Sequence, residues 1–188
     1  MEYFEDRIFR PSDLSNTGLP RGEYDHCQFL GIGSGLEQLS GLRFAGCTFT
    51  DCNLTAANVV KTAFQDVSFE GCKMLGIRFD QCDAMLLELS FKNCQLNMSH
   101  FYKLKLKNTS FIQCNLSETD FTEADLTGSI FDGTDLNRAH FERSVLEKAD
   151  FRTAFNYAID PENNRIRKAH FSLEGLPGLL GKYGISVS

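Results

Sequence analysis

The 188-residue chain has no tryptophan, only four prolines and no uninterrupted apolar run long enough to cross a membrane as a helix. Its start, MEYFEDRIF, is acidic and lacks the basic and apolar regions of a secretory signal peptide. Lys and Arg (19) are fewer than Asp and Glu (25), so the formal net charge is −6 at pH 7. We therefore expect a soluble, cytoplasmic protein that contacts neither a membrane nor nucleic acid directly.

Motifs for metal binding and catalysis are also missing. The seven cysteines contain no CxxC pair. GIGSGL, at 31–36, is an incomplete dinucleotide fingerprint with no helix pattern after it, and we interpret it as an irregular corner. Ser99 and His100 are neighbours, and neighbours along a strand face opposite ways, which separates a nucleophile from its base. We expect no cofactor, no bound metal and no catalytic residue.

A period of five residues fills most of the sequence. From Phe91 to Phe151, Phe and Leu alternate at every fifth position without exception. An earlier frame from Leu14 to Phe79 has an apolar residue at every fifth position except Ser34. A small residue tends to stand two places before each bulky one. Helices repeat at 3.6 residues and strands at 2.0, so neither element alone explains this spacing.

The five-residue units resemble those of the pentapeptide repeat proteins, in which a small residue is followed by Asp or Asn, by Leu or Phe and by two polar residues. ADLTG, TDFTE, TDLNR and ADFRT are close copies of that unit, and the resemblance covers roughly residues 14–155. It implies an all-β fold, a right-handed quadrilateral β-helix in which one unit forms one side and twenty residues form one coil. Such repeats bury their apolar residues only by stacking on neighbouring coils.

The fold prediction divides the chain into three parts. Residues 1–13 are a lead-in or cap, 14–155 form the repeat β-helix with a two-residue irregularity near 80–90, and 156–188 form a C-terminal cap with a short helix. If four units make a coil, the Phe/Leu alternation places Phe over Phe on two sides and Leu over Leu on the other two, about 4.8 Å apart. The interior is then filled, and no pore runs through it.

The twenty-residue coil also predicts which polar residues stack. The cysteines all fall in the small inward position, where a thiol behaves as a small apolar group; they are Cys27, Cys47, Cys52, Cys72, Cys82, Cys94 and Cys114. His100, Asp120 and His140 form an outer column, but its ends lie about 10 Å apart, too far to share one ion. We interpret it as a hydrogen-bonded surface column.

Negative charge is concentrated in residues 117–151, which contain nine Asp and Glu against three Lys and Arg. Some of these charges stack on opposite ones, such as Glu118 on Arg138, Glu123 between Lys103 and Arg143, and Asp125 on Lys105. Six carboxylates have fewer partners and are the candidate acidic binding face: Asp120, Asp132, Asp135, Glu142, Glu147 and Asp150. Mimicry of duplex DNA and simple solubility explain this charge equally well.

Two departures from the repeat are candidate contact elements. Twelve residues separate Phe79 from Phe91 where the frame requires ten, so two surplus residues form either a β-bulge or a projecting loop near Asp83, Met85 and Leu87. After Phe155 the pattern ends.

In the tail, we expect Ile159, Ile166 and Phe171 to cap the last coil. Ser172 is then expected to start a short helix, with the dimerisation candidates Leu173, Leu176, Leu180 and Tyr183 on one face. This face packs on the cap or on a second chain, and the family resemblance implies a homodimer through this segment.

CKMLG, FTEAD and the ending KAHFSLEG…LL are similar to the pentapeptide repeat proteins that protect DNA gyrase from quinolones, microcin and albicidin. Those proteins bind the enzyme, partly as mimics of duplex DNA, without catalysis of their own. The resemblance implies a non-enzymatic binding protein for gyrase or topoisomerase IV that confers resistance to a drug or toxin. The alternative is a structural or adaptor protein for another partner. A third class, an enzyme that uses the column of His100, Asp120 and His140, requires a metal.

Overall fold

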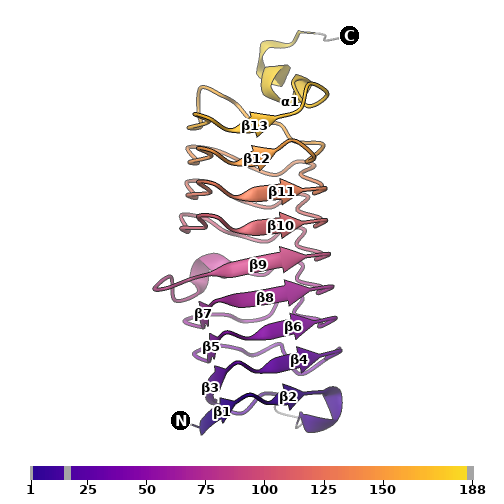
Figure 1. Ribbon diagram of the computed structural model, residues 1–188, viewed down its shortest axis with the longest axis vertical. Coiled ribbons are helices and arrows are strands. Elements are labelled where there is room, and N and C mark those ends of the chain that lie inside the picture. Colours follow the sequence, from indigo (N-terminus) through magenta and orange to yellow (C-terminus); the bar gives the residue numbers. More distant parts are fainter. Residues whose placement is uncertain (1, 15–17, 186–188) are drawn as a thin grey trace.

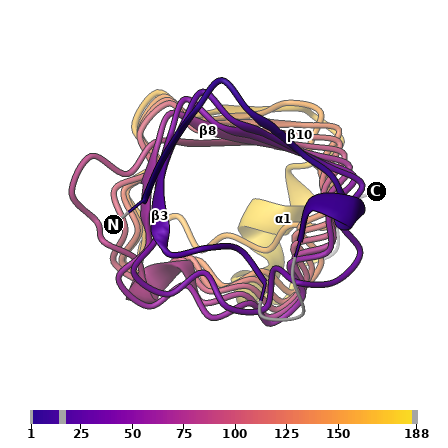
Figure 2. The ribbon, with the colours of Figure 1, turned by 90° about the horizontal axis from the view of Figure 1, so that it is seen from below.

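Positions twenty residues apart stack on one another. Tyr24 pairs with Phe44, and Phe44 with Phe64, and every strand pair is parallel. In the computed structural model, which describes residues 2–14 and 18–185, this register winds the chain into a right-handed, four-sided β-helix of about eight turns (Figure 1). Seen along its axis, the coils superpose as a rough quadrilateral (Figure 2). The predicted fold class is confirmed.

The four sides of the coil are numbered here in chain order. The first side is centred on Phe4, Tyr24, Phe44, Phe64, Leu106, Leu126 and Leu146. The second is centred on Phe9, Phe29, Phe49, Phe69, Phe91, Phe111, Phe131, Phe151 and Phe171. The third is centred on Leu54, Met74, Leu96, Leu116 and Leu136, and the fourth on Leu39, Val59, Phe79, Phe101, Phe121 and Phe141.

Regular strands occupy only two of these sides. The first side has the sheet of β1 (Glu2–Glu5), β3 (Gly22–Asp25), β5 (Arg43–Ala45) and β7 (Ala63–Gln65). The second side has the nine-stranded sheet of β2 (Ile8–Phe9), β4 (Gln28–Leu30), β6 (Thr48–Thr50), β8 (Val67–Glu70), β9 (Leu89–Lys92), β10 (Ser110–Ile112), β11 (Ile130–Asp132), β12 (Asp150–Phe151) and β13 (His170–Phe171). Single parallel bridges hold the third and fourth sides. Three short 3-10 helices complete the elements of the described residues: η1 (Pro11–Asp13), η2 (Phe79–Gln81) and η3 (Gly181–Tyr183).

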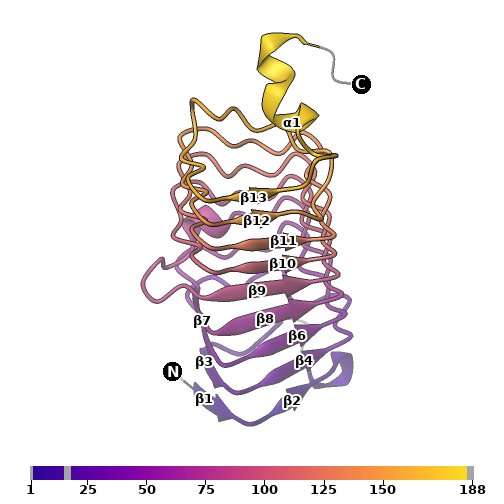
Figure 3. The ribbon, with the colours of Figure 1, turned by 45° about the horizontal axis from the view of Figure 1, so that its top comes forward.

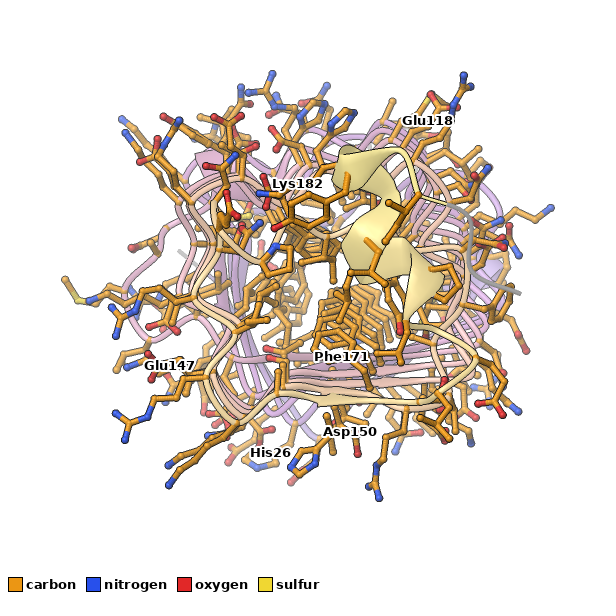
Figure 4. The ribbon with its side chains drawn as sticks, turned by 90° about the horizontal axis from the view of Figure 1, so that it is seen from above. His26, Glu118, Glu147, Asp150, Phe171 and Lys182 are labelled. Carbon is orange, nitrogen blue, oxygen red and sulfur yellow. The ribbon has the colours of Figure 1, made fainter. Side chains whose placement is uncertain are left out.

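Large apolar side chains fill the interior, and the aromatic rings stack along the rod, continuously on the second side from Phe9 to Phe171 (Figure 4). Phe91 and Phe111 stack with ring centres 5.2 Å apart and nearly parallel planes. Each buried ring of this size contributes on the order of 1.5–3 kcal/mol relative to exposure. The predicted ladder of Phe over Phe is therefore confirmed, and the bulky side chains that recur every fifth residue hold the coils together.

The strict alternation of Phe and Leu holds only in the C-terminal coils. There the aromatic stacks occupy the second and fourth sides, which face each other. In the N-terminal coils the stacks occupy the first and second sides, which are neighbours. The change comes where the stack on the first side ends at Phe64 and the stack on the fourth side begins at Phe79, whose rings meet edge to face at 6.1 Å.

One position of the predicted frame is wrong. The frame places Ser34 inside, but this side chain is exposed, and Ile32 and Leu36 are both fully buried instead. The chain leaves the five-residue register here because a buried serine would lose its contacts with water, while Leu36 fills the same space with apolar surface. Gly35 adopts a left-handed backbone with φ of 100°, which permits this corner.

The paired strands extend beyond the predicted repeat region on both sides. β1 pairs with β3 and β13 pairs with β12, so the stacking runs from Glu2 to Phe171. At the first coil, the guanidinium of Arg7 lies over the rings of Phe4 and Phe9, 5.3 and 5.2 Å from their centres. The guanidinium covers the first ring of the aromatic stacks on the first and second sides, since no further coil of the described residues lies beneath these rings.

At the other end, the chain crosses the last coil and forms α1 (Pro177–Leu180) (Figure 3). The helix starts later than predicted, because Ser172 caps a turn: its hydroxyl accepts a hydrogen bond from the Gly175 amide at 3.1 Å. Ile159 is buried, and Ile166 and Phe171 pack against the core, as expected of a cap. Among the described residues, no helix has the length and apolar character needed to span a bilayer.

Candidate protein-interaction surface

Nearly all buried polar side chains of the described residues are hydrogen-bonded, and the exception is the hydroxyl of Tyr157 beneath the C-terminal segment. Ser99 is buried and its hydroxyl donates to the Met74 carbonyl at 2.9 Å, while His100 faces outward, so the two form no catalytic pair. All seven cysteines are free thiols. Burial raises the pKa of Cys47 to about 12 and also raises that of Cys82, which keeps both protonated.

The predicted column of His100, Asp120 and His140 is present on the fourth side. The Nδ1 atom of His100 lies 3.8 Å from Oδ2 of Asp120. Partial burial favours a raised pKa for Asp120, but hydrogen bonds from Thr122 and electrostatic attraction to His100 and His140 outweigh it and lower the pKa. In the part of the chain that the structure describes, no three His, Cys, Asp or Glu side chains cluster closely enough to hold a metal ion.

The six carboxylates of the candidate acidic face do not form one face. Successive registers place Asp132 and Asp150 on the second side, Asp135 on the third and Glu147 on the first. The remaining two, Asp120 and Glu142, are on the fourth side. Figure 4 shows Glu147 and Asp150 pointing outward from different sides of the rod. This part of the prediction is corrected: a band of sequence that covers almost two coils is spread around the whole circumference.

Each of these carboxylates also has a partner. Arg152 binds Asp150 through two nitrogens, Arg165 binds Glu147 at 2.7 Å, and Arg143 binds Glu142 at 2.6 Å. Asp132 accepts a hydrogen bond from Thr153, and Asp135 accepts one from Asn156. Some partners come from the next coil and others lie one or two residues away on the same side, and a spacing of twenty residues predicts neither of the local pairs.

The predicted register is present throughout, including the bridge between Lys105 and Asp125, but one of the ion pairs involves a different lysine. Glu118 faces Arg138 at 3.8 Å, and Glu123 lies between Lys103 and Arg143. Asp125, however, pairs with Lys107 at 3.3 Å rather than with Lys105. Lys105 makes no ion pair with any described residue, which leaves its ammonium group available on the first side.

The two surplus residues form a projecting loop, residues 84–88, between η2 and β9 (Figures 1 and 2). Met85 and Leu86 are 74% and 67% exposed, while Leu87 packs against the core. The carboxylate of Asp83 accepts a hydrogen bond from the Met85 amide and fixes the start of the loop. Of the predicted loop residues, Asp83 and Met85 are exposed and Leu87 is not. The prediction did not name Leu86, which is exposed beside Met85.

The four predicted dimerisation residues differ in exposure. Leu173 and Tyr183 are exposed, Leu176 is 39% exposed and Leu180 is half-buried. They do not share one face of a regular helix, because α1 contains four residues and continues as η3. Ion pairs from Lys182 to Asp160 and Glu162 hold this segment against the last coil.

Comparison with known proteins gives a consistent result. One family model, described as a pentapeptide repeat region, matches residues 84–154, and a second, described as pentapeptide repeats in eight copies, matches residues 38–71. Together they cover more than half of the chain. No protein with a curated description matches the sequence significantly.

Two solved structures of trypsin-treated variants of QnrB1, described as a plasmid-mediated fluoroquinolone resistance protein, have the same fold. Each is 14% identical with a TM-score of 0.63; the match covers 99% of this chain and 97% or 98% of theirs. HetL, described as involved in heterocyst differentiation regulation in the cyanobacterium Nostoc sp., is 17% identical with a TM-score of 0.47, over 92% of this chain and 85% of its own.

Proposed function

Because this chain belongs to the pentapeptide repeat proteins, we propose that it binds another protein through its outer surface and performs no catalysis. The observation that carries the proposal is the filled interior: the side chains that recur every fifth residue are buried, and the thiols and hydroxyls beside them are protonated or bonded. A small-molecule site typically needs a concave and mostly apolar cavity, whereas the centre of this rod is filled by the side chains of the described coils.

The partner we propose is DNA gyrase or topoisomerase IV, and the outcome is protection from a drug or toxin in the cytoplasm. The fold shared with QnrB1 over nearly the full length of both chains supports this choice, together with the resemblance of CKMLG, FTEAD and the C-terminal segment. The loop of residues 84–88 is the proposed contact, since Met85 and Leu86 present apolar surface that a partner can bury.

A supercoiling assay tests this function. Purified protein is added to gyrase with and without a fluoroquinolone or albicidin, and we expect supercoiling to be restored in the presence of at least one drug. Replacement of both Met85 and Leu86 by Ser is expected to raise the protein concentration needed by about tenfold, the equivalent of about 1.4 kcal/mol. Met98→Ser is the matched control, because Met98 is 50% exposed on the third side. No binding and no change in supercoiling at micromolar protein would contradict the proposal.

DNA mimicry is a narrower form of this proposal. The spread and pairing of the six carboxylates favour instead a contact that does not copy the charge of a duplex. Conversion of Asp132 and Asp135 to Asn distinguishes the two forms. Mimicry requires protection to fall and its salt dependence to weaken, whereas contact through the loop leaves both unchanged.

An adaptor for another protein is the second candidate, favoured by the same scattered charge. Affinity capture from cell extract with the wild type, and in parallel with the Met85 and Leu86 double variant, separates the candidates. Recovery of a topoisomerase by the wild type alone supports the first. Recovery of a different protein that depends on the loop supports the adaptor.

We also propose a homodimer through the C-terminal segment, in which Leu173, Leu176 and Tyr183 are buried against a second copy. Sedimentation velocity is expected to show a dimer for the wild type and a monomer for Leu173→Ser combined with Leu176→Ser. A monomer for the wild type at micromolar concentration would contradict this.

A further inference from the structure

The first side of the solenoid has one level at which neighbouring coils are not paired. Below it, Ala63 pairs with Asp83, and above it, Lys105 pairs with Asp125. No strand or bridge joins Asp83 to Lys105 within the described residues. The other three sides are paired without interruption at this level. The surplus residues therefore interrupt one ladder and leave the rest of the rod intact.

A groove of about 390 Å³ lies at this interruption. Leu86 and Leu87 of the loop form its apolar wall, and Lys105 and Lys107 of the next coil form its opposite wall. Two carboxylates, those of Asp66 and Glu88, also line the groove, and neither forms an ion pair with Lys105 or Lys107 within the described residues. Figures 1 and 3 show the loop standing out from the rod beside β9. The groove is open to solvent, because Leu86, Lys105 and Lys107 in its lining are exposed.

The chemistry of this groove differs from the rest of the surface. Lys105 has no ion pair, and Lys107 has only the exposed pair with Asp125 at 3.3 Å. Most other basic side chains on the C-terminal coils already face carboxylates within 4 Å. Leu86, 67% exposed, lies on the opposite wall. Within the described residues, an ammonium group without an ion pair, that of Lys105, thus lies beside an exposed leucine at an interrupted β-ladder.

We propose that this groove binds an extended segment of a protein partner in which an acidic side chain stands beside an apolar one. An extended chain suits an interrupted ladder, because a strand added there takes the place of the missing pairing. Its acidic side chain faces Lys105 and Lys107, and its apolar side chain covers Leu86. This inference rests on the proposed protein-binding function and adds the place and the chemistry of the contact.

Two synthetic probes test the groove directly. One is a fluorescent six-residue peptide of alternating Asp and Val, and the other is the same peptide with Lys for Asp. Fluorescence anisotropy is expected to show saturable binding of the Asp–Val peptide below about 1 mM and binding of the Lys–Val peptide weaker by about tenfold or more. Equal binding of the two peptides, or no binding of either, overturns the inference.

Variants locate the binding. Lys105→Glu is expected to weaken binding of the Asp–Val peptide by about tenfold or more, because it replaces one of the two positive charges by a negative one. Lys61→Glu is the matched control on the fourth side, where Lys61 is also exposed and unpaired among the described residues, and we expect it to bind normally. Deletion of Met85 and Leu86 restores the twenty-residue spacing and is expected to abolish binding. Unchanged affinity in both the Lys105→Glu and the deletion variants overturns the inference.

The outcome also separates this inference from the proposed function. If the wild type protects gyrase but does not bind the peptide, the inference about the groove is wrong and the proposed function still holds. If the protein binds the peptide but has no effect on a topoisomerase, the inference about the groove is supported and the proposed partner is wrong. If sedimentation shows that Lys105→Glu converts a dimer to a monomer, a second copy fills the groove and the inference is overturned.

Discussion

The N-terminal coils, residues 2–79, and the C-terminal coils, residues 91–171, place their aromatic rings differently. In the first group the ring stacks stand on neighbouring sides, and Phe44 meets Phe49 at 5.4 Å. In the second they stand on opposite sides, and Phe101 meets Phe111 at 6.0 Å. Both arrangements bury the rings almost completely. The coil therefore requires a filled cross-section with two rings per turn, and it does not require a fixed order of Phe and Leu.

The small inward positions differ in the same way. In the N-terminal coils they are often thiols, such as Cys47, whose Sγ lies 3.3 Å from the Tyr24 carbonyl. In the C-terminal coils Cys94 and Cys114 are the last thiols, and hydroxyls or alanines follow; Ser129 donates to the Leu106 carbonyl at 2.7 Å. For Cys47 and Ser129 the accepting carbonyl belongs to the residue 23 positions earlier. This position therefore accepts any small side chain, with or without a donor, and cysteine fits it as a small apolar group.

The largest expected effect comes from removal of a ring in either group. Phe111→Ala and Phe44→Ala should each lower the free energy of unfolding by about 3–5 kcal/mol, because each ring is fully buried between two stacked neighbours. Urea denaturation followed by circular dichroism measures both. A much smaller loss for Phe44→Ala would show that neighbouring stacks tolerate a cavity better than opposed ones and would break the equivalence of the two arrangements.

The next prediction concerns the small inward positions. Ser129→Ala should cost about 1 kcal/mol, because the Leu106 carbonyl loses one of its two donors and keeps the Thr109 amide. Cys47→Ser should stay within about 0.5 kcal/mol of the wild type, since a hydroxyl can donate to the same Tyr24 carbonyl. Thermal and urea unfolding of the two variants give the comparison. A loss for Cys47→Ser as large as that for Ser129→Ala would mean that the N-terminal slots require sulfur.

A smaller effect is expected from acid. Hydrogen bonds from Arg152 hold the pKa of Asp150 below its ordinary value. A carboxyl whose folded pKa is depressed stabilises the fold above its unfolded pKa of about 3.9, and this contribution is lost as the pH falls through the folded pKa. Asp150→Asn should therefore reduce stability by about 0.5 kcal/mol at pH 7 and by nothing at pH 2, as measured by the midpoint of urea denaturation. An equal loss at both pH values would assign the effect to packing.

The smallest effect concerns the first coil. Arg7→Ala removes the guanidinium from the rings of Phe4 and Phe9 and should cost about 0.5–1 kcal/mol. Hydrogen exchange should quicken in β1 and β2 and stay unchanged in β10 and β11, because coils contact only their neighbours. Arg167→Ala, an exposed arginine of the C-terminal coils, is the control for general charge effects. Faster exchange along the whole rod would show that the coils unfold as one unit.

The sequence predicts the solenoid because the residues that recur at every fifth position are the ones that are buried. Phe111 and Leu116 are inside since every fifth residue points inward, and no tertiary information is needed to see this. Ser34 shows the limit of the method. A fixed frame cannot show that the chain leaves its register at a glycine-rich corner so that Leu36 replaces a polar side chain.

The candidate surface is less predictable because position around the circumference depends on register and on side-chain reach. Asp132 and Asp135 are close in sequence, yet they belong to different sides. Arg152 reaches back two residues to Asp150, a pairing that a search at twenty-residue spacing does not find. The twelve-residue spacing between Phe79 and Phe91 locates the loop, but it does not show that Leu87 turns inward while Leu86 remains in solvent.

The twenty-residue register also governs how such a chain can change its length. Insertion of twenty residues between the 84–88 loop and α1 moves the two about 4.8 Å further apart and keeps their angular relation. Insertion of five residues turns everything downstream by a quarter of a revolution and sends the two features to different sides. Whole coils therefore adjust distance while single units adjust direction, so one rod can meet partners of different dimensions with the same contact elements.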